Sequence, residues 1–133
     1  MKHVAKVSAL LLLLLLVGCS GKLTIYEARI AVLRWEQKVR YNSQCRDGCS
    51  LAADEVKNNT GPMVIAGIQE LPQENAARVD LVFNNFKYGF SGSEQSYTGP
   101  GVAILSRYND GTWILRKVSF AEREWDNLNI KAE

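Results

Sequence analysis

Apolar residues between positions 25 and 39 recur at steps of three and four, which is the spacing of one face of a helix. Thr24 and Glu27 stand just before and inside this run, where a capping box would satisfy the first free amides of a helix. We therefore predict an amphipathic helix that begins after Thr24 and packs on a sheet. Its apolar face comprises Ile25, Ala28, Val32, Trp35 and Val39, widened by Tyr26, Ile30 and Leu33. Its polar side includes Arg29, Arg34, Glu36, Gln37, Lys38 and Arg40.

The second half of the chain has the pattern of strands joined by turns. Val79, Leu81 and Phe83 alternate with polar residues, as in a strand with one buried face. The apolar parity shifts after this point, which indicates a bulge near Asn84-Asn85, and Asn109-Asp110-Gly111 is a hairpin turn signal. The four predicted strands are Met63–Leu71, Arg78–Tyr88, Gly101–Tyr108 and Thr112–Phe120.

The remaining segments are shorter or more ambiguous. Residues 51–57 predict a short helix, which Asn58 to Pro62 would end. Residues 122–133 are charged but include Trp125, Leu128 and Ile130, so this tail either extends the last strand or packs as a short helix. The element order predicts an α+β fold, in which the N-terminal amphipathic helix packs on a four-stranded antiparallel meander.

The closing hairpin from Asn109 to Leu115, within a meander over residues 76–120, resembles the cystatin-like and NTF2-like folds. The single long helix is closer to the cystatin-like layout, since NTF2-like folds normally have more N-terminal helix. The resemblance implies a shape and no particular activity, because folds of this kind carry many functions.

The N-terminus has the arrangement of a targeting segment. Lys2, His3 and Lys6 precede an apolar run from Val7 to Val17 that is only about half as long as the ~20 residues needed to span a bilayer. The run ends in Leu16-Val17-Gly18-Cys19, which resembles the lipobox of bacterial lipoproteins. The resemblance implies that residues 1–18 are removed and that the thiol and the new amine of Cys19 are acylated. The alternative is an ordinary secretory signal with a chance cysteine.

Several acyl chains on one residue hold a protein stably at a membrane. In such lipoproteins Ser20, in place of an aspartate, favours the periplasmic face of the outer membrane over the inner membrane. Residues 19–23 would then be the lipidated end and a short tether, which extended reaches at most about 17 Å, and residues 24–133 a single globular domain. A helix so close to the anchor could alternatively lie on the lipid surface.

Composition narrows the chemistry. Removal of residues 1–18 takes away two lysines and the single histidine, and leaves 14 basic and 14 acidic side chains. A net side-chain charge near zero argues against a nucleic-acid partner. The lack of histidine excludes Ser-His and Cys-His pairs within the mature chain, and no phosphate-binding or cofactor motif is found. We therefore expect no enzymatic activity. A carboxylate-only hydrolase remains the alternative, with Glu70, Glu74, Asp80 and Glu94 as its candidates.

Two cysteines remain after Cys19. Cys45 and Cys49 flank Arg46-Asp47-Gly48, and Asp-Gly is a turn signal. In an oxidising compartment the expected product is a disulfide that closes this turn. Two cysteines without histidine are too few for a zinc site, and the C-x3-C spacing differs from that of thioredoxin-like redox pairs.

The segment from Tyr88 to Gly101 reads as a long Gly- and Ser-rich loop, and long loops in compact domains are often functional. Its candidate partner-binding residues are Phe90, Glu94, Gln95 and Tyr97, since aromatic side chains on a polar loop suit protein recognition. The alternative is that these aromatics fold back onto the sheet. A small-ligand pocket lined by Trp35, Phe83 and Trp113 is a further variant, although such residues are more often plain core.

The sequence therefore favours a lipid-anchored, non-enzymatic interaction and envelope-assembly module that binds an envelope protein, or a subunit of a larger assembly, through the 88–101 loop or an exposed sheet face. The alternative is an inhibitor, immunity or exclusion lipoprotein that binds an incoming toxin, hydrolase, phage or plasmid component. Small, disulfide-bonded, lipid-tethered domains suit this second task.

Overall fold

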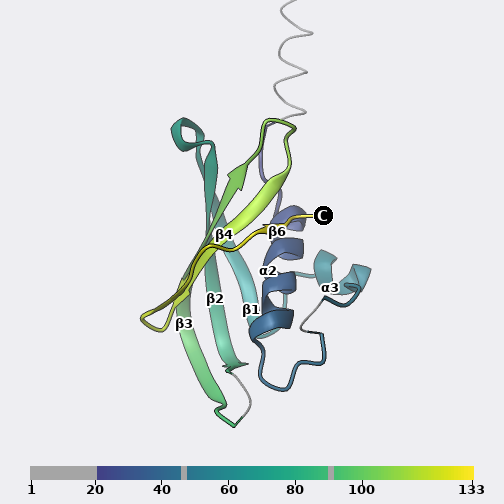
Figure 1. Cartoon of the computed structure of the whole chain (residues 1–133), viewed down its shortest axis with the longest axis vertical. Helices are drawn as coiled ribbons and strands as arrows, with labels where there is room; N and C mark the ends of the chain where they lie inside the picture. The colour runs from purple at the N-terminus through teal and green to yellow at the C-terminus, as the bar shows by residue number, and fades with distance from the viewer. Residues whose placement is uncertain (1–20, 46–47, 90–91) are drawn as a thin grey trace, which may run out of the picture.

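The computed structural model describes residues 21–45, 48–89 and 92–133, and shows an α+β fold (Figure 1). The signal segment, Cys19 and Phe90 lie outside the described residues. Two helices precede the sheet, α2 (Ile25–Val39) and α3 (Ala53–Lys57). The strands are β1 (Met63–Leu71), β2 (Ala76–Tyr88), β3 (Gln95–Arg107), β4 (Trp113–Phe120), β5 (Arg123–Trp125) and β6 (Ile130–Lys131), with a 3-10 turn η1 (Pro72–Glu74) between β1 and β2.

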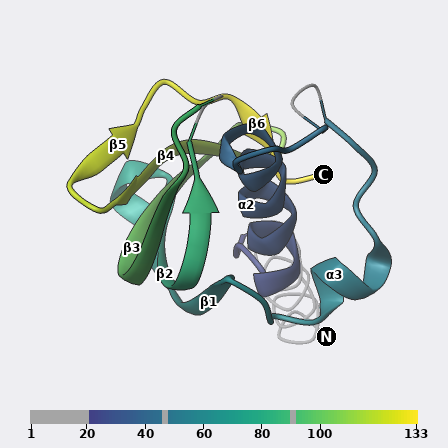
Figure 2. The same cartoon turned by 90° about the horizontal axis from the view of Figure 1, so that it is seen from below.

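Helix α2 begins where the sequence predicts. The Thr24 hydroxyl accepts a hydrogen bond from the Glu27 amide at 3.1 Å, and the Glu27 carboxylate accepts one from the Thr24 amide at 3.1 Å. This is the capping box, which satisfies two amides that the helix itself leaves free. The helix lies inside the curl of the sheet (Figure 2). Its apolar side chains belong to the same buried cluster as those of the strands. Because most of that face, from Ala28 to Val39, is buried, it is not available to lie on a lipid surface.

The predicted polar side of α2 includes two residues that are in fact buried, so the prediction is wrong at these positions. Arg29 is 1% exposed and Glu36 is 8% exposed, whereas Ile25 and Tyr26 of the expected apolar side are more than half exposed. The Arg29 guanidinium donates through its two terminal nitrogens to the carbonyls of Met63 (2.9 Å), Glu55 (2.7 Å) and Asn58 (3.3 Å), which offsets part of the cost of burying this charge. This residue therefore ties α2 to the segment that leads into β1.

The sheet has six strands, so the prediction of four is wrong in number, although all pairs are antiparallel as expected. Its order is β1-β2-β3-β4-β5, and β6 also pairs with β4. The extra strands come from the charged tail: Val118 pairs with Trp125, and Leu115 pairs with Ile130. The tail thus extends the sheet and does not form a helix.

The predicted long loop between residues 88 and 101 is also wrong. Strand β3 begins at Gln95, so most of this segment pairs with the end of β2, and Tyr88 faces Gln95. The register shifts between Phe83 and Phe86, which places the bulge at Asn84-Asn85 as predicted, and Asn85 has a φ of 49°. The bulge returns Phe86 and Tyr88 to the buried face, where they extend the core.

The chain enters the fold at one end of α2 and of the sheet. The carbonyl of Gly21 accepts a hydrogen bond from Arg107 at the end of β3 (3.0 Å), and the amide of Leu23 donates to the Glu70 carboxylate near the end of β1 (3.1 Å). We call this end, with the η1 turn, the proximal end. The β2–β3 hairpin tip lies at the opposite, distal end (Figure 1). Helix α2 has 15 residues and so separates the two ends by about 22 Å.

Candidate functional site

Three of the predicted partner-binding residues fall in the described part of the β2–β3 hairpin. The Glu94 carboxylate pairs with Lys87 at 3.2 Å, and the Gln95 side chain accepts a hydrogen bond from the Tyr88 hydroxyl at 2.9 Å. Tyr97 packs back on the sheet: its ring centroid is 5.6 Å from that of Phe83, and its hydroxyl donates to the Pro100 carbonyl at 2.7 Å. The hairpin is therefore a paired ribbon with an aromatic face toward the core.

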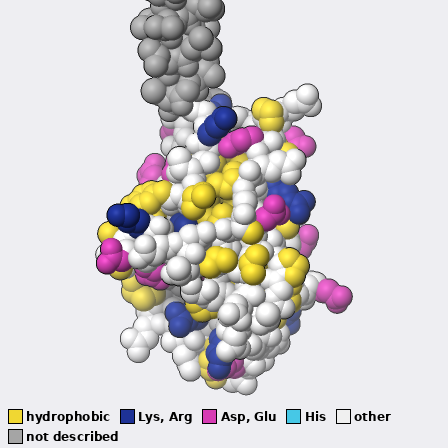
Figure 3. All heavy atoms as spheres, turned by 180° about the vertical axis from the view of Figure 1, so that it is seen from behind, with side chains coloured by type: hydrophobic (Ala, Val, Ile, Leu, Met, Phe, Trp, Pro, Cys, Tyr) yellow, Lys and Arg dark blue, Asp and Glu magenta, His cyan; other side chains and the backbone are white. Residues whose placement is uncertain are grey.

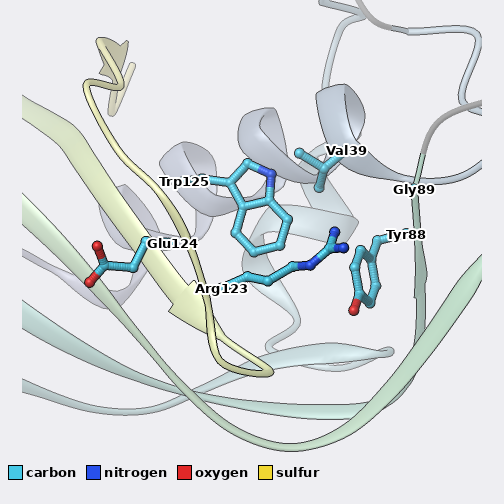
Figure 4. Close-up of a pocket in the computed structure, with 6 residues that line it drawn as sticks. All are labelled: Val39, Tyr88, Gly89, Arg123, Glu124 and Trp125. Carbon is cyan, nitrogen blue, oxygen red and sulfur yellow. The ribbon is translucent and has the colours of Figure 1, made fainter.

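A cavity of about 230 Å³ opens beside this hairpin, at the distal end (Figure 4). Residues from the end of α2, the end of β2 and the whole of β5 line it, and they meet only because the sheet curls around the helix. The lining residues are Val39, Tyr88, Gly89, Arg123, Glu124 and Trp125. The amide of Gly89 donates to the Val39 carbonyl at 3.0 Å, which closes the wall opposite β5.

An aromatic cluster fixes the apolar wall of this distal cavity. The Trp125 ring stacks on Phe120, with centroids 4.7 Å apart, and meets Trp35 edge-on at 5.6 Å. Tyr88 lies edge-on to Trp125 at 6.0 Å and to Phe120 at 5.0 Å. Rings held on several sides lose little freedom when a ligand arrives, so the wall is preorganised.

The charges around the cavity are unequal. Arg123 and Trp125 point into it, whereas Glu124 points away (Figure 4) and pairs with Lys117 of β4 at 3.5 Å. Among the described residues, Arg123 has no ion-pair partner. The cavity therefore combines an aromatic wall with a cation that the described part of the chain does not neutralise.

A second, more polar hollow of about 360 Å³ lies at the same end. Glu36 of α2 and Arg40, which follows the helix, border it together with Lys87 and Glu94 of the hairpin. Burial raises the pKa of Glu36, and this effect outweighs the nearby guanidiniums of Arg40 and Arg29, which lower it. The Glu36 carboxylate lies 3.9 Å from Arg40.

Sequence reasoning missed Arg123 and Trp125 as site residues. The signal was present in the alternation of Arg123, Glu124 and Trp125, which has the period of a strand. Trp35, Phe83 and Trp113 are at most 4% exposed and lie in the core, as the favoured interpretation of these aromatics had it, and not in a pocket between helix and sheet. Trp113 also borders a hollow of about 340 Å³ at the proximal end, beside Gly21 and Lys22.

Three of the four carboxylates considered for hydrolysis have a side-chain partner or hold a backbone amide. Asp80 pairs with Arg78 at 3.1 Å, Glu94 with Lys87, and Glu70 holds the Leu23 amide. Glu70 and Glu74 border one open hollow of about 270 Å³ at the η1 turn. In the described ranges 21–45, 48–89 and 92–133, no three His, Cys, Asp or Glu side chains gather as metal ligands would.

The face of the sheet away from α2 carries a small apolar strip. Val82 is 44% exposed and pairs across the strands with Val64 and Pro100. Seen from behind, the molecule shows hydrophobic side chains across its middle, with charges of both signs around them (Figure 3). This mixture agrees with a net charge close to zero.

Cys45 and Cys49 come together as predicted, with their Sγ atoms at disulfide distance, 2.07 Å apart. Gln37 of α2 holds this turn, since its side chain donates to the Cys49 carbonyl and accepts from the Cys49 amide, both at 3.2 Å. Within the part of the chain that the structure describes, no helix is both long and apolar enough to span a bilayer.

Comparison with known proteins adds no relative. No protein-family model, curated protein or solved structure matches this chain.

Proposed function

We propose that this chain is a lipid-anchored envelope protein that binds a partner protein through its distal end and catalyses no reaction itself. The observation that carries the proposal is the opposition of the two ends. The chain enters at the proximal end, two residues after Cys19, and the cavity with its aromatic wall and unneutralised Arg123 lies at the other.

The anchor rests on the sequence Leu16-Val17-Gly18-Cys19 and on the way the next residues join the fold. Two residues of chain span at most about 7 Å, so a lipid on Cys19 would hold Gly21 close to the membrane. Gly21 and Leu23 are in turn hydrogen bonded to Arg107 and Glu70. The proximal end would therefore face the membrane, which in the proposal is the periplasmic face of the outer membrane.

The distal end then faces away from the lipid. A surface for protein recognition gains most from aromatic and arginine side chains in a partly desolvated pocket. The distal cavity offers both kinds of side chain, since Tyr88 is buried, Trp125 is partly buried and Arg123 is exposed. The order of a long helix followed by an antiparallel meander supports a cystatin-like layout as part of this proposal.

Photocrosslinking in cells tests the proposal with a matched pair of sites. Ser93 lies in the distal β2–β3 turn and Gln73 in the proximal η1 turn, so both are exposed tips next to the same strand. A photoreactive residue at Ser93 should give one discrete protein adduct, and the same residue at Gln73 should give lipid adducts. The Cys19→Ala variant should leave the membrane fraction, because it lacks the lipidated thiol.

Two results would contradict the proposal. Membrane pelleting of Cys19→Ala at the wild-type level would remove the anchor. The same protein adduct from both tips, or none from Ser93, would remove the distal interaction surface. The identity of a Ser93 adduct separates an assembly subunit from an incoming enzyme, toxin, phage or plasmid component.

A further inference from the structure

Strand β5 presents two different side chains to the distal cavity. Because alternate residues of a strand face the same way, Arg123 and Trp125 share the inner face while Glu124 points outward to Lys117 (Figure 4). The inner face of β5 therefore offers a guanidinium and an indole two residues apart. A guanidinium binds a carboxylate through two parallel hydrogen bonds, and an indole packs on an apolar side chain.

The two outer edges of the sheet, β1 and β5, differ in whether their backbone groups are already hydrogen bonded. At β1 the Asn59 side chain occupies both backbone groups of Ile65, donating to its carbonyl at 2.7 Å and accepting from its amide at 2.8 Å. Arg29 occupies the Met63 carbonyl on the same strand. In the described sheet, β5 has a strand neighbour on one side only, which is β4. An unpaired edge accepts an extended peptide through its backbone groups.

The size of the cavity favours side chains over a free small molecule. Its volume of about 230 Å³ is below the roughly 300–1,000 Å³ usual for small-molecule sites. The wall opposite β5 is bare backbone at Gly89, whose φ is 130° and where a Cβ atom would collide with the Ser93 carbonyl. The Ser93 backbone fills the space that a side chain at Gly89 would need, so this part of the wall is backbone alone.

We propose that the distal cavity binds an extended peptide segment with an apolar side chain and a carboxylate two residues apart, laid beside β5. In antiparallel pairing the apolar residue comes first, opposite Trp125, and the acidic residue follows, opposite Arg123. The proposal deepens the proposed function and rests on it, because it names the chemistry of the partner at the same end of the molecule.

Fluorescence polarisation of labelled, capped peptides tests this chemistry on the full mature protein in detergent. The probe has a Phe-Ser-Asp core, and its controls have Phe-Ser-Asn and Ala-Ser-Asp cores. We expect the Asp-to-Asn and Phe-to-Ala changes each to weaken binding about tenfold or more. The Arg123→Ala variant should bind the Asp and Asn peptides equally.

Lys131→Ala is the matched control, since it removes one positive charge from β6, the other short strand that pairs with β4. It should bind all three peptides as the wild type does. Three results would each overturn the proposed chemistry. The wild type could bind the Asp and Asn peptides equally, or not bind the Asp peptide at all. Arg123→Ala and Lys131→Ala could also lose the same affinity for the Asp peptide.

This test and the crosslinking test fail separately. A protein adduct at Ser93 with no peptide discrimination would leave the interaction function standing and remove the acidic-apolar segment. Peptide discrimination with no adduct in cells would leave the acidic-apolar segment standing and remove the interaction function.

Discussion

The Phe120 ring stacks on Trp125, with centroids 4.7 Å apart and planes inclined by 10°. Phe120 is 4% exposed and is the last residue of β4, whereas Trp125 is the last residue of β5 and lines the distal cavity. The stack therefore connects the core of the domain directly to the wall of the candidate site.

Replacing Phe120 by Ala should destabilise the protein by about 3–5 kcal/mol, because it removes a buried ring and leaves a cavity among its aromatic neighbours. Phe120→Leu, which keeps much of the volume, should cost about 1.5 kcal/mol or less. Urea unfolding followed by tryptophan fluorescence measures both. Equal, small losses would mean that the aromatic cluster is not packed as described.

Replacing Arg29 by Met should cost about 3 kcal/mol or more, because three carbonyls lose a charged donor inside the protein. Arg34→Met is the control on the same helix, since Arg34 is partly exposed and, within the described residues, donates only to the Glu133 carbonyl. We expect that change to stay below about 1 kcal/mol. Chemical denaturation gives both free energies, and similar values for the two variants would contradict the buried role of Arg29.

Glu36 should make stability fall as the pH rises. Its pKa is raised in the folded protein by burial, so the folded state holds this proton more tightly than the unfolded chain does. The stability that this proton contributes is present below the ordinary glutamate pKa of about 4.3 and is lost as the pH rises through the raised pKa. Glu36→Gln should therefore have a higher Tm than the wild type at pH 7.

The difference in Tm between Glu36→Gln and the wild type should disappear below pH 4. Glu94→Gln is the control, because Glu94 is exposed and paired with Lys87, and it should show no such gain at pH 7. Thermal scans across this pH range test the prediction. A lower Tm for Glu36→Gln at pH 7 would show that the Arg40 pair outweighs the cost of burial.

The Cys45–Cys49 bond closes a short loop, with a sequence separation of four residues. Chain-entropy arguments give about 2 kcal/mol of stabilisation for so small a loop. The Cys45→Ser, Cys49→Ser double variant should lose about this much, and a reductant should lower the Tm of the wild type but not of the variant. Alkylation of both thiols in protein taken from intact envelopes would contradict the disulfide.

The sequence predicted correctly those features that depend on residues close to them along the chain. The start of α2 follows from Thr24 and Glu27, and β1 has the predicted bounds because its apolar run ends at Pro72. The bulge at Asn84-Asn85 follows from the shift in apolar parity.

The remaining features depend on distant partners. Arg29 is buried because carbonyls 26 or more residues away accept its hydrogen bonds, which periodicity on α2 cannot reveal. The Gly- and Ser-rich start of β3 resembles a loop but pairs with the end of β2. The distal cavity forms only where the curl of the sheet brings Val39, Tyr88 and Trp125 together, so the sequence alone did not show it.

The most direct test of the account is the crosslink from Ser93, measured in cells in the wild-type, Arg123→Ala and Lys131→Ala backgrounds. The account predicts one discrete protein adduct in the wild type and in Lys131→Ala, and its loss in Arg123→Ala at an unchanged level of folded protein. An adduct of equal yield in Arg123→Ala would contradict recognition through the distal cavity.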